Sequence, residues 1–322
     1  MARIINVKSK PKDWNLADFA AQRNNLLFYR SLGGLGDILM HRMIFEDFKK
    51  DNPELKIFFA CPTQYHPALI DHPFLDGVLN YQEVSLNDYL MWFNTSSSCG
   101  RYETFIAPLS DKNRSDIWAE SCGVKLTNHN MHIIMTDEEL KFGKEKIEKI
   151  RNSKSRPSIA LCPVSAMVSK NLLPEQIKDL VNELHSMNYF VFGLHGTPIQ
   201  TLTEMGVPTI CDIKTRQWMS VIHAADYVIS VDTAALHLAG GIKKPLTGIF
   251  SWADGYTYTQ HYPTAHVVQL HRDRYSELPC CPCYTYGNCV LAKGQIKPCL
   301  TMITHQMIMD QVVKMLSNLE KK

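Results

Sequence analysis

The sequence predicts an α/β protein made of two doubly wound domains, and two observations support this. Short apolar segments alternate with amphipathic ones along almost the whole chain, as in strand–helix–strand units. The alternation restarts after a charged, serine-containing linker, "RNSKSRP", near residue 153. A chain of 322 residues is long enough for two cores. We therefore expect an N-terminal domain over residues 1–153 and a C-terminal domain over residues 154–322, each a parallel sheet covered by helices.

In the first half, strands are expected where short aliphatic and aromatic runs end at turn-forming residues. These runs are residues 25–29, 56–60, 77–81, 104–107 and 132–135. Apolar residues at helical spacing predict a helix over residues 37–50. A second helix is expected over residues 136–150, because Thr136 is followed three residues later by Glu139, which is the pattern of a capping box.

The second half repeats this alternation of strands and helices. Strands are expected at residues 158–162, 189–194, 227–231 and 245–250. Helices are expected at residues 174–187, 215–225, 233–241 and, near the end of the chain, at about 304–319. Ligands of doubly wound sheets bind beyond the carboxyl ends of the strands, so functional residues are expected in the turns that lead from a strand into a helix.

The composition indicates a folded soluble protein and leaves the type of partner open. The hydrophobic content of 45% and the charged content of 20% are ordinary, and a net charge of +2 argues neither for nor against nucleic acid. No apolar run approaches the length of a membrane span. The first residues, "MARIINVKSKPKDW", lack the apolar core of a signal peptide. We therefore expect a cytoplasmic protein that is a monomer.

The first strand-to-helix turn, "SLGGLGD", is a GxGxxG pattern with Ser31 in place of the first glycine. A dinucleotide-binding turn would also need an acidic residue at the end of the next strand, and "FFACPTQ" has none. The alternative is that Gly33, Gly34 and Gly36 let a substrate approach the backbone. Asp37 then either caps the helix or accepts a proton from an attacking hydroxyl group.

Four segments together carry a resemblance to a known family. They are "SLGGLGDILM", "CPVSAMVSKNLLPEQI", "SVDTAALHLAGGIKKPLTGIF" and the tail "CCPCYTYGNCVLAKGQIKPCLTMITHQMIMDQVVKML". In order and spacing the chain resembles the family 9 glycosyltransferases, the ADP-heptose:lipopolysaccharide heptosyltransferase-like enzymes. The resemblance covers most of the chain. It implies the GT-B architecture, in which two Rossmann-like domains face a central cleft, the N-terminal one binding the acceptor and the C-terminal one the nucleotide sugar.

The resemblance also implies roles for individual residues. Asp37 falls on the position of the general base, and Lys170 on a position that contacts the donor phosphates. The further donor-binding positions are Ser165, Ser169, Asp232, Thr233, Ala234 and His237, with Ala234 in place of the usual glycine. Structural alternatives stay open for three of these residues. Asp232 is otherwise a helix cap, His237 a packed core residue, and Lys170 a solvated loop residue.

These roles predict an inverting transfer by a single displacement, without a metal ion. Lys170, Thr233 and the N-terminus of the following helix would stabilise the leaving diphosphate, while Asp37 takes the proton of the acceptor. Domain closure over the substrates is expected. The family often has a glutamate that binds the ribose after the strand at residues 189–194, and "GLHGTPIQ" offers none. The ADP-linked donor of the family is therefore a default, and the nucleotide stays open.

The acceptor also stays open, between a lipopolysaccharide core sugar, another glycan and a modified base in DNA. The N-terminal half contains basic residues that could face an anionic glycolipid or a nucleic-acid backbone. They are Lys8, Lys10, Lys12, Arg23, Arg30, Arg42, Lys49 and Lys50. Interleaved acidic residues equally allow an ordinary solvated surface. The aromatic segments "YLMWF" and "SWADGYTYTQHYP" either stack on substrates or pack internally. A non-catalytic relative that only binds nucleotide sugars is the alternative to an enzyme.

Five of the ten cysteines lie between Cys280 and Cys299. Cys280, Cys283, Cys289 and Cys299 have a plausible spacing for a structural zinc ion, beginning with a CxxC pair. The later gaps match no common zinc module. Disulfide bonds and reduced, packed thiols are the alternatives. Since the other five cysteines are scattered, the pattern is not that of a secreted disulfide framework.

Overall fold

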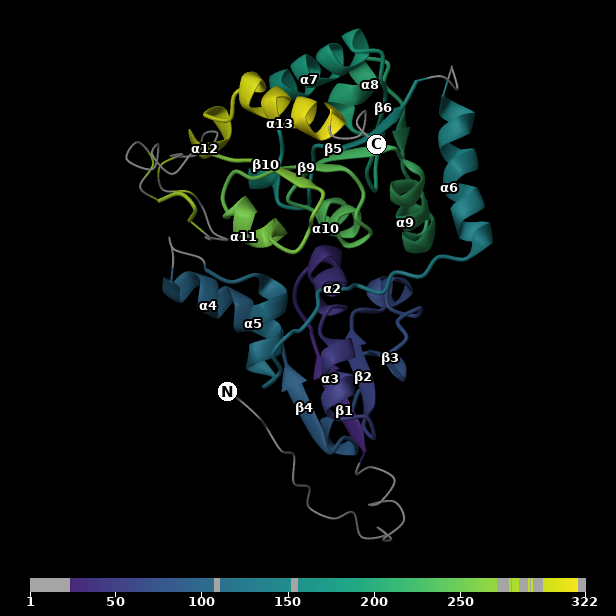
Figure 1. Cartoon of the computed structure of the whole chain (residues 1–322), viewed down its shortest axis with the longest axis vertical. Coiled ribbons are helices and arrows are strands. Elements are labelled where there is room, and N and C mark those ends of the chain that lie inside the picture. The colour runs from purple at the N-terminus through teal and green to yellow at the C-terminus, as the bar shows by residue number, and fades with distance from the viewer. Residues whose placement is uncertain are drawn as a thin grey trace. The chain divides into compact units, whose positions relative to one another are not determined.

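The computed structural model describes residues 24–106, 111–151, 156–270, 278, 280–283, 289, 291 and 298–317. The chain forms two compact units, which we describe separately. The first unit is Met1–Tyr102 with Lys112–Ile134, and the second is Glu103–Asp111 with Met135–Lys322. Each unit contains one parallel sheet with helices packed on it (Figure 1). The prediction of two parallel α/β sheets is therefore confirmed.

The sheet of the first unit has four strands in the order β3-β2-β1-β4. They are β1 (Asn25–Tyr29), β2 (Lys56–Cys61), β3 (Gly77–Asn80) and β4 (Met91–Asn94), and every pairing is parallel. The central strand β1 is apolar because both of its faces are covered, and Leu27 and Phe28 are fully buried. The ring of Phe28 packs edge-on against Phe45 and Phe48 of the following helix.

The helical elements of the first unit include two short helices where one long helix was expected. These elements are α2 (Leu35–His41), α3 (Phe45–Asp51), η1 (Thr63–Ala68), η2 (Leu86–Asp88), α5 (Arg114–Ser121) and α4 (Ser98–Ile106), whose residues from Glu103 on belong to the second unit. Between α2 and α3 the backbone makes i→i−3 hydrogen bonds at Met43 and Ile44. There the side chain of Arg42 is completely buried, where it forms a bidentate pair with Asp71 and donates to the carbonyl oxygen of Met131.

Two of the strands predicted for this half do not form, and one strand that does form is not predicted. Residues 104–106 belong to α4, because a four-residue apolar run looks the same in a strand and in a helix. Residues 132–135 form no strand: His132 has a φ of +50°, and the N–H of Ile134 donates to Asp71 instead of a neighbouring strand. The fourth strand of the sheet is β4, part of the aromatic segment "YLMWF".

The sheet of the second unit has six parallel strands in the order β10-β9-β8-β5-β6-β7. They are β5 (Ser158–Cys162), β6 (Phe190–Leu194), β7 (Thr209–Ile210), β8 (Tyr227–Val231), β9 (Leu246–Ile249) and β10 (Ala265–Val268). The chain order reverses between β5 and β8. In doubly wound sheets this switch point opens a crevice at the carboxyl ends of the two strands, where ligands bind.

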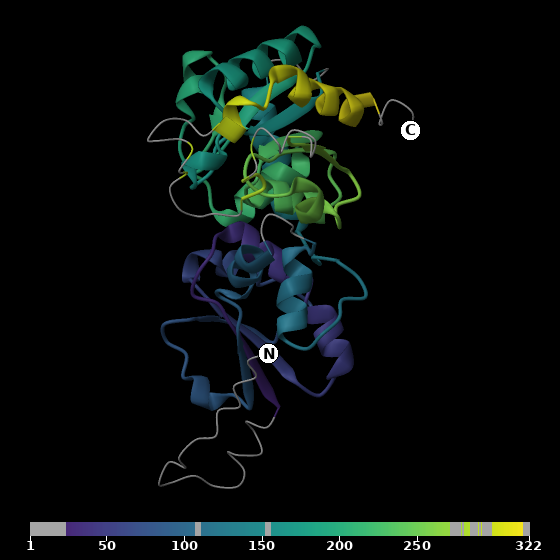
Figure 2. The ribbon, with the colours of Figure 1, turned by 90° about the vertical axis from the view of Figure 1, so that its left-hand side faces the viewer.

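Helices cover this sheet on both sides. The helical elements of this unit are α6 (Asp137–Ile150), η3 (Val168–Lys170), α7 (Pro174–Ser186), α8 (Gln200–Glu204), α9 (Thr215–Ala224), α10 (Ala234–Gly241), α11 (Gly255–Thr259), α12 (Pro298–Thr301) and α13 (His305–Ser317). The terminal helix α13 lies alongside α7 and packs on β9 and β10 (Figures 1 and 2). Among the described residues, no helix combines the length and apolar character that a bilayer crossing requires.

Helix α6 precedes the domain boundary expected at residue 153 but packs against α9 of the second unit. Thr136 and Glu139 form the expected capping box. The Glu139 carboxylate also binds Arg216 of α9 through two hydrogen bonds of 2.7 and 2.6 Å. Gly143 lies directly against the backbone carbonyl of Ser220, so the two helices approach closely at this point. The boundary itself stays a prediction.

Candidate active site

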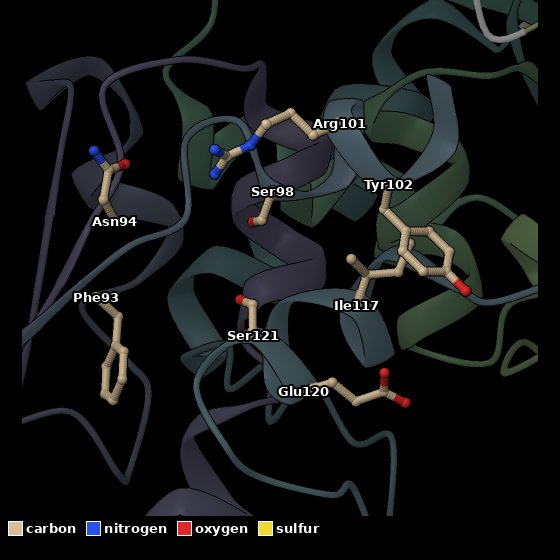
Figure 3. Close-up of a pocket in the computed structure, with 8 residues that line it drawn as sticks. All are labelled: Phe93, Asn94, Ser98, Arg101, Tyr102, Ile117, Glu120 and Ser121. Carbon is tan, nitrogen blue, oxygen red and sulfur yellow. The ribbon is translucent and has the colours of Figure 1, made fainter. Parts of the chain in front are cut away.

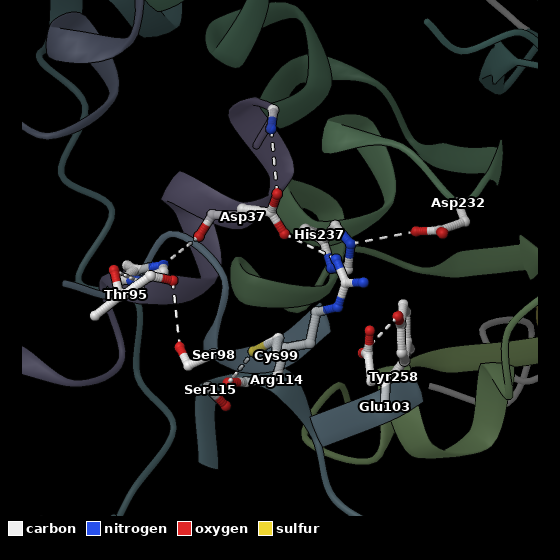
Figure 4. Close-up of polar contacts among 12 residues, drawn as sticks. Asp37, Thr95, Ser98, Cys99, Glu103, Arg114, Ser115, Asp232, His237 and Tyr258 are labelled. Carbon is white, nitrogen blue, oxygen red and sulfur yellow. Dashed lines mark hydrogen bonds and ion pairs between the residues drawn. The ribbon is translucent and has the colours of Figure 1, made fainter. Parts of the chain in front are cut away.

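Asp37 of the first unit lies in the first turn of α2, with its side chain 14% exposed. Its Oδ1 accepts a hydrogen bond from Nη1 of Arg114 at 2.9 Å (Figure 4). Its Oδ2 lies 3.1 Å from Nη2 of Arg30 and accepts a hydrogen bond of 3.1 Å from the backbone N–H of Gly34. Helix capping therefore accounts only for the contact with Gly34, because two guanidinium groups also bind the carboxylate.

Both arginines are themselves fixed in position. Arg30 follows β1 directly, its guanidinium lies 4.8 Å from the ring centre of Trp118, and its Nη1 donates to the carbonyl oxygen of Thr95 at 2.7 Å. Arg114 is the first residue of α5. Two adjacent positive charges stabilise the ionised form of the Asp37 carboxylate and hold it in one orientation. Neither arginine is recognisable in the sequence as a partner of Asp37: Arg114 lies 77 residues away, and Arg30 stands out only as one of several basic residues.

Gly33 is required by these contacts. Its φ is +102°, in the region that favours glycine, and a Cβ there would collide with the side chains of Arg30 and Asp37. A Cβ on Gly34 would meet nothing within 4 Å. Gly36 is buried in the first turn of α2. That the three glycines admit a substrate to the backbone stays a prediction, since the close approach at Gly33 is to the chain's own side chains.

His41, one turn after Asp37, fastens α2 to the end of β4. Its Nδ1 lies 2.8 Å from the carbonyl oxygen of Asp37, and its Nε2 lies 2.9 Å from Oγ1 of Thr95. Burial, reinforced by the charge of Arg30, holds the pKa of His41 well below its usual value. The imidazole is therefore neutral near pH 7 and acts as a structural link.

A cavity of about 340 Å³ opens in the first unit at the carboxyl end of β4, between α4 and α5 (Figure 3). Its lining consists of Phe93, Asn94, Ser98, Arg101, Tyr102, Ile117, Glu120 and Ser121. Glu120 is paired with Lys112 at 2.6 Å. Ile117 lies one turn after Arg114 on the same face of α5, so the cavity is close to the Asp37 cluster. The aromatic, amide and hydroxyl groups of the lining suit a carbohydrate.

Four of the basic residues singled out in the sequence lie in the described part of the first unit, and all four are paired within it. Arg30 and Arg42 are buried and bound within the unit. Nζ of Lys49 lies 3.5 Å from Asp76, and Nζ of Lys50 lies 2.6 Å from Glu46. Lys8, Lys10, Lys12 and Arg23 are outside the described residues. These pairings favour the ordinary solvated surface over a nucleic-acid-binding one.

In the second unit, the predicted donor residues meet at the switch point of the sheet. Lys170 is the last residue of η3 in the loop after β5, and Asp232 directly follows β8. Nζ of Lys170 lies 2.6 Å from Oδ2 of Asp232, with the two side chains 15% and 6% exposed. Burial alone would raise the pKa of Asp232, but the charge of Lys170 and the hydrogen bond with His237 lower it well below its usual value. Lys170 is thus an ion-paired residue and not a solvated one.

His237 belongs to the same cluster. Its Nε2 lies 3.5 Å from Oδ1 of Asp232 (Figure 4), and its Nδ1 lies 2.9 Å from the hydroxyl group of Tyr262. His237 is 5% exposed. Burial, together with the charge of Asp232, raises the pKa of Tyr262 above its usual value, so the phenol stays protonated. His237 is therefore packed in the core and also a neighbour of the Asp232 carboxylate.

Thr233 caps α10, which begins at Ala234. Its Oγ1 accepts a hydrogen bond from the N–H of Ala235 at 3.2 Å and lies 3.0 Å from Oγ of Ser230. The alternative that Asp232 is the helix cap is therefore wrong. Because Asp232 does not cap the helix, its carboxylate is available to Lys170, and the start of α10 lies next to this ion pair.

The two serines of the loop after β5 make contacts within the second unit. Oγ of Ser165 donates to the carbonyl oxygen of Met167 at 2.8 Å, and its N–H donates to Oδ1 of Asn171 at 2.7 Å. The carbonyl oxygen of Ser169 accepts a hydrogen bond of 3.2 Å from Oγ of Ser251. These contacts fix the loop that carries Lys170, and the donor-binding roles of both serines stay predictions.

Trp252 also belongs to this cluster, although in the sequence it stands out only as part of the aromatic segment "SWADGYTYTQHYP". Trp252 is 1% exposed, and its Nε1 donates to Oδ2 of Asp232 at 3.2 Å. The ammonium group of Lys170 lies 4.7 Å from the centre of its ring. For this residue the packing alternative is correct, but the packing is against the charged pair.

A second cavity, of about 260 Å³, lies in the second unit beyond the ends of β5 and β6. Its lining consists of Val164, Asn171, Leu172, Pro174, Ile177, His195, Thr197, Pro198, Ile199, Gln200 and Thr201. Apolar walls with a few polar groups suit the nucleoside part of a donor. The segment "GLHGTPIQ" provides His195, Thr197 and Gln200, and no carboxylate lines this described cavity.

Most of the segment that follows Leu270 and contains the clustered cysteines is outside the described residues. No disulfide bond joins the described cysteines. Cys281 is buried, and its burial, together with the proximity of Cys299, Cys283 and Cys280, raises its pKa to about 12. A structural zinc ion at Cys280, Cys283, Cys289 and Cys299 stays a prediction.

Comparison with known proteins gives one family match and several similar folds. The sequence model of glycosyltransferase family 9 (heptosyltransferase) matches residues 113–283, which is more than half of the chain. The glycosyltransferase of family 9 from Veillonella parvula DSM 2008 superposes with a TM-score of 0.69 at 11% identity, covering 92% of this chain and 98% of its own. No match was found among curated proteins.

Two further solved structures have a similar fold. E. coli ADP-heptose lps heptosyltransferase II has a TM-score of 0.65 at 13% identity, over 92% of this chain and 99% of its own. The dodecameric iron-containing heptosyltransferase TibC, from enterotoxigenic E. coli and in complex with ADP-D-β-D-heptose, has a TM-score of 0.66 at 12% identity, over 94% and 79%. At these identities the likeness establishes the GT-B fold.

Proposed function

The chain belongs to glycosyltransferase family 9, and we propose that it transfers a sugar from a nucleotide diphosphate sugar to a hydroxyl group, with inversion at the anomeric carbon. The observation that supports this most is the pair of charged clusters, one in each unit. Asp37 with Arg30 and Arg114 provides a fixed, ionised carboxylate. Asp232 with Lys170 places a cation at the switch point of the second sheet. These are the two groups that the reaction requires, a proton acceptor and a stabiliser of the leaving diphosphate.

In the proposed reaction, the acceptor hydroxyl gives its proton to the Asp37 carboxylate as its oxygen attacks the anomeric carbon. The bond between that carbon and the diphosphate oxygen breaks, and the nucleoside diphosphate leaves with the bonding electron pair. A single displacement of this kind inverts the anomeric configuration. The two arginines keep the carboxylate ionised before the reaction and correctly oriented during it.

On the donor side, we assign the diphosphate to Lys170, Thr233 and the start of α10. A helix N-terminus attracts negative charge, and the ammonium group adds a full positive charge beside it. These groups can stabilise the developing charge without a metal ion. The nucleoside is assigned to the 260 Å³ cavity beside them, where His195, Thr197 and Gln200 take the place of a ribose-binding carboxylate.

We further propose an ADP-linked heptose as donor, because two similar folds are ADP-heptose enzymes by name. The acceptor assigned to the 340 Å³ cavity of the first unit is a sugar of a lipopolysaccharide core. A modified base in DNA is the second candidate, and the pairing of Lys49 and Lys50 with acidic residues of the same unit disfavours it. The proposed setting is the cytoplasm, and the proposed state is a monomer.

The test combines a donor screen with a single variant. ADP-, UDP-, GDP- and CMP-linked sugars are compared by thermal shift, and transfer is then measured with the sugar nucleotide that stabilises the protein. Asp37→Asn should lower kcat by roughly 100-fold or more, as loss of a general base does, while the thermal shift by the donor is retained. If Asp37→Asn transfers at the wild-type rate, the base is another group. If no sugar nucleotide stabilises the wild-type protein, the donor assignment is wrong.

A further inference from the structure

Trp252 occupies an unusual place for a buried indole, because it contacts both members of an ion pair. It lies in the loop between β9 and α11, and its side chain is almost completely buried. The face of its ring is 4.7 Å from the Lys170 ammonium group, and its Nε1–H donates to Oδ2 of Asp232. A phenylalanine in this place could keep the ring contact but not the hydrogen bond to Asp232.

The loop around Trp252 is fixed from two sides. The carbonyl oxygen of Trp252 accepts a hydrogen bond of 2.9 Å from the N–H of Cys283, and the carbonyl oxygen of Ser251 accepts one of 3.6 Å from Sγ of Cys281. On the other side, Oγ of Ser251 donates to the backbone of Ser169, next to Lys170. The indole therefore has one fixed position relative to the lysine.

We propose that Trp252 is a positioning residue that allows Lys170 to leave Asp232 for the diphosphate of the donor. The inference rests on the proposed donor site. In the free protein the positive charge of Lys170 is neutralised by Asp232 at 2.6 Å. A bound diphosphate competes with this carboxylate for the same ammonium group.

The free-energy cost of moving Lys170 from Asp232 to the diphosphate depends on which groups remain beside the carboxylate. A buried carboxylate that loses its only cation is strongly destabilised. Here the indole N–H of Trp252 stays on Oδ2, and His237 stays near Oδ1. The ring also attracts the ammonium group wherever the lysine turns across its face. Trp252 thus lowers the free-energy cost of moving Lys170 from the carboxylate to the phosphates.

The role can be tested by comparing a nucleoside diphosphate with its nucleoside, because Lys170 acts only on the phosphates. ADP and adenosine, or UDP and uridine if the uridine nucleotide binds better, are titrated into the full chain by calorimetry. Trp252→Phe keeps an aromatic ring but removes the N–H donor. We expect roughly tenfold weaker binding of the diphosphate, because the hydrogen bond from Trp252 stabilises the Asp232 carboxylate more once Lys170 has left it, and unchanged binding of the nucleoside.

Lys170→Met is the matched variant. It should reduce the preference for the diphosphate to the part that Thr233 and the start of α10 provide. Adding Trp252→Phe to it should have no further effect on that preference, because both residues act on the same contact. Tryptophan emission should change when ADP binds to the wild-type protein and change less in Trp252→Phe, since the ammonium group moves relative to this ring.

Three results would overturn the inference, and they are distinguishable. If the wild-type protein prefers ADP to adenosine and Trp252→Phe keeps the full preference, Trp252 is only a packing residue. If Trp252→Phe weakens nucleoside and nucleoside diphosphate equally, its effect is on the shape of the site. If the wild-type protein binds no nucleoside diphosphate, the proposed donor site fails as well.

Discussion

Each of the two carboxylates in the proposed chemistry is accompanied by cations of its own unit. Asp37 contacts two guanidinium groups, and Asp232 contacts one ammonium group. The two arrangements differ in what they allow. Each guanidinium group contacts a different oxygen of Asp37, which favours a permanent orientation of the carboxylate, whereas a lysine on a flexible stem can change partners. This difference agrees with a fixed base and an exchangeable phosphate ligand.

The backbone at Gly33 has a conformation that would strain any other residue type. Gly33→Ala should lower the free energy of unfolding by about 1–3 kcal/mol, because alanine is strained at a φ of +102° and its Cβ would displace Arg30 and Asp37. It should also lower kcat, since the displaced groups include the proposed base. Urea unfolding and a transfer assay measure the two effects.

Gly34→Ala is the matched control for that experiment. The neighbouring glycine has a φ of −96°, and a Cβ there meets nothing within 4 Å. We expect a stability change below about 1 kcal/mol, as for a substitution at a helix N-cap. Equal losses in the two variants would show that the Arg30–Asp37 contact is not the reason for glycine at position 33.

Helices α6 and α9 cross so closely at Gly143 and Ser220 that no room is left for a larger side chain at position 143. Gly143→Val should destabilise the second unit by about 1–3 kcal/mol, because its side chain would be forced into the Ser220 carbonyl and would separate the helices. The separation would also stretch the pair between Glu139 and Arg216. Chemical denaturation gives the size of the effect. Lys141→Ala, on the exposed side of α6, should change stability by less than about 0.5 kcal/mol. If the two substitutions cost the same, the crossing is not tight in solution.

The elements also show where sequence patterns fail. The helix expected over residues 37–50 is interrupted because the side chain of Arg42 is bound inside the unit by Asp71 and Met131, both distant in the chain. The strand β4 was missed because its residues alternate only weakly in burial at the edge of the sheet. At Arg42 tertiary contacts therefore outweigh the local pattern.

For the molecule as a whole, buried neutral histidines predict an acid-sensitive first unit. Nε2 of His72 lies 2.9 Å from the carbonyl oxygen of Arg42, and its Nδ1 accepts a hydrogen bond from the N–H of Phe74. Burial, together with the charge of Arg42, lowers the pKa of His72 to about 3. In the unfolded chain the pKa is near 6.5. The unfolded state therefore binds more protons between these two values.

Stability should consequently be constant above about pH 6.5 and fall as the pH drops toward 3, by up to about 1.4 kcal/mol per pH unit for each such histidine. Urea unfolding at several pH values measures the slope. His72→Gln, which cannot gain a proton, should reduce the slope of unfolding free energy against pH by up to about 1.4 kcal/mol per pH unit. An unchanged slope in this variant would assign the acid sensitivity to other groups.

The sequence by itself determined the strand–helix alternation, the capping box at Thr136 and Glu139, and the order of motifs that marks the family. These features are local, because hydrophobic periodicity and turn chemistry are properties of neighbouring residues. Only the tertiary structure decided which charges meet. Arg114 reaches Asp37 across 77 residues, and Lys170 reaches Asp232 across 62. Such pairs form when folding brings distant segments into a water-excluded place, where an unpaired charge would be too costly, and no single segment of sequence records its eventual partner.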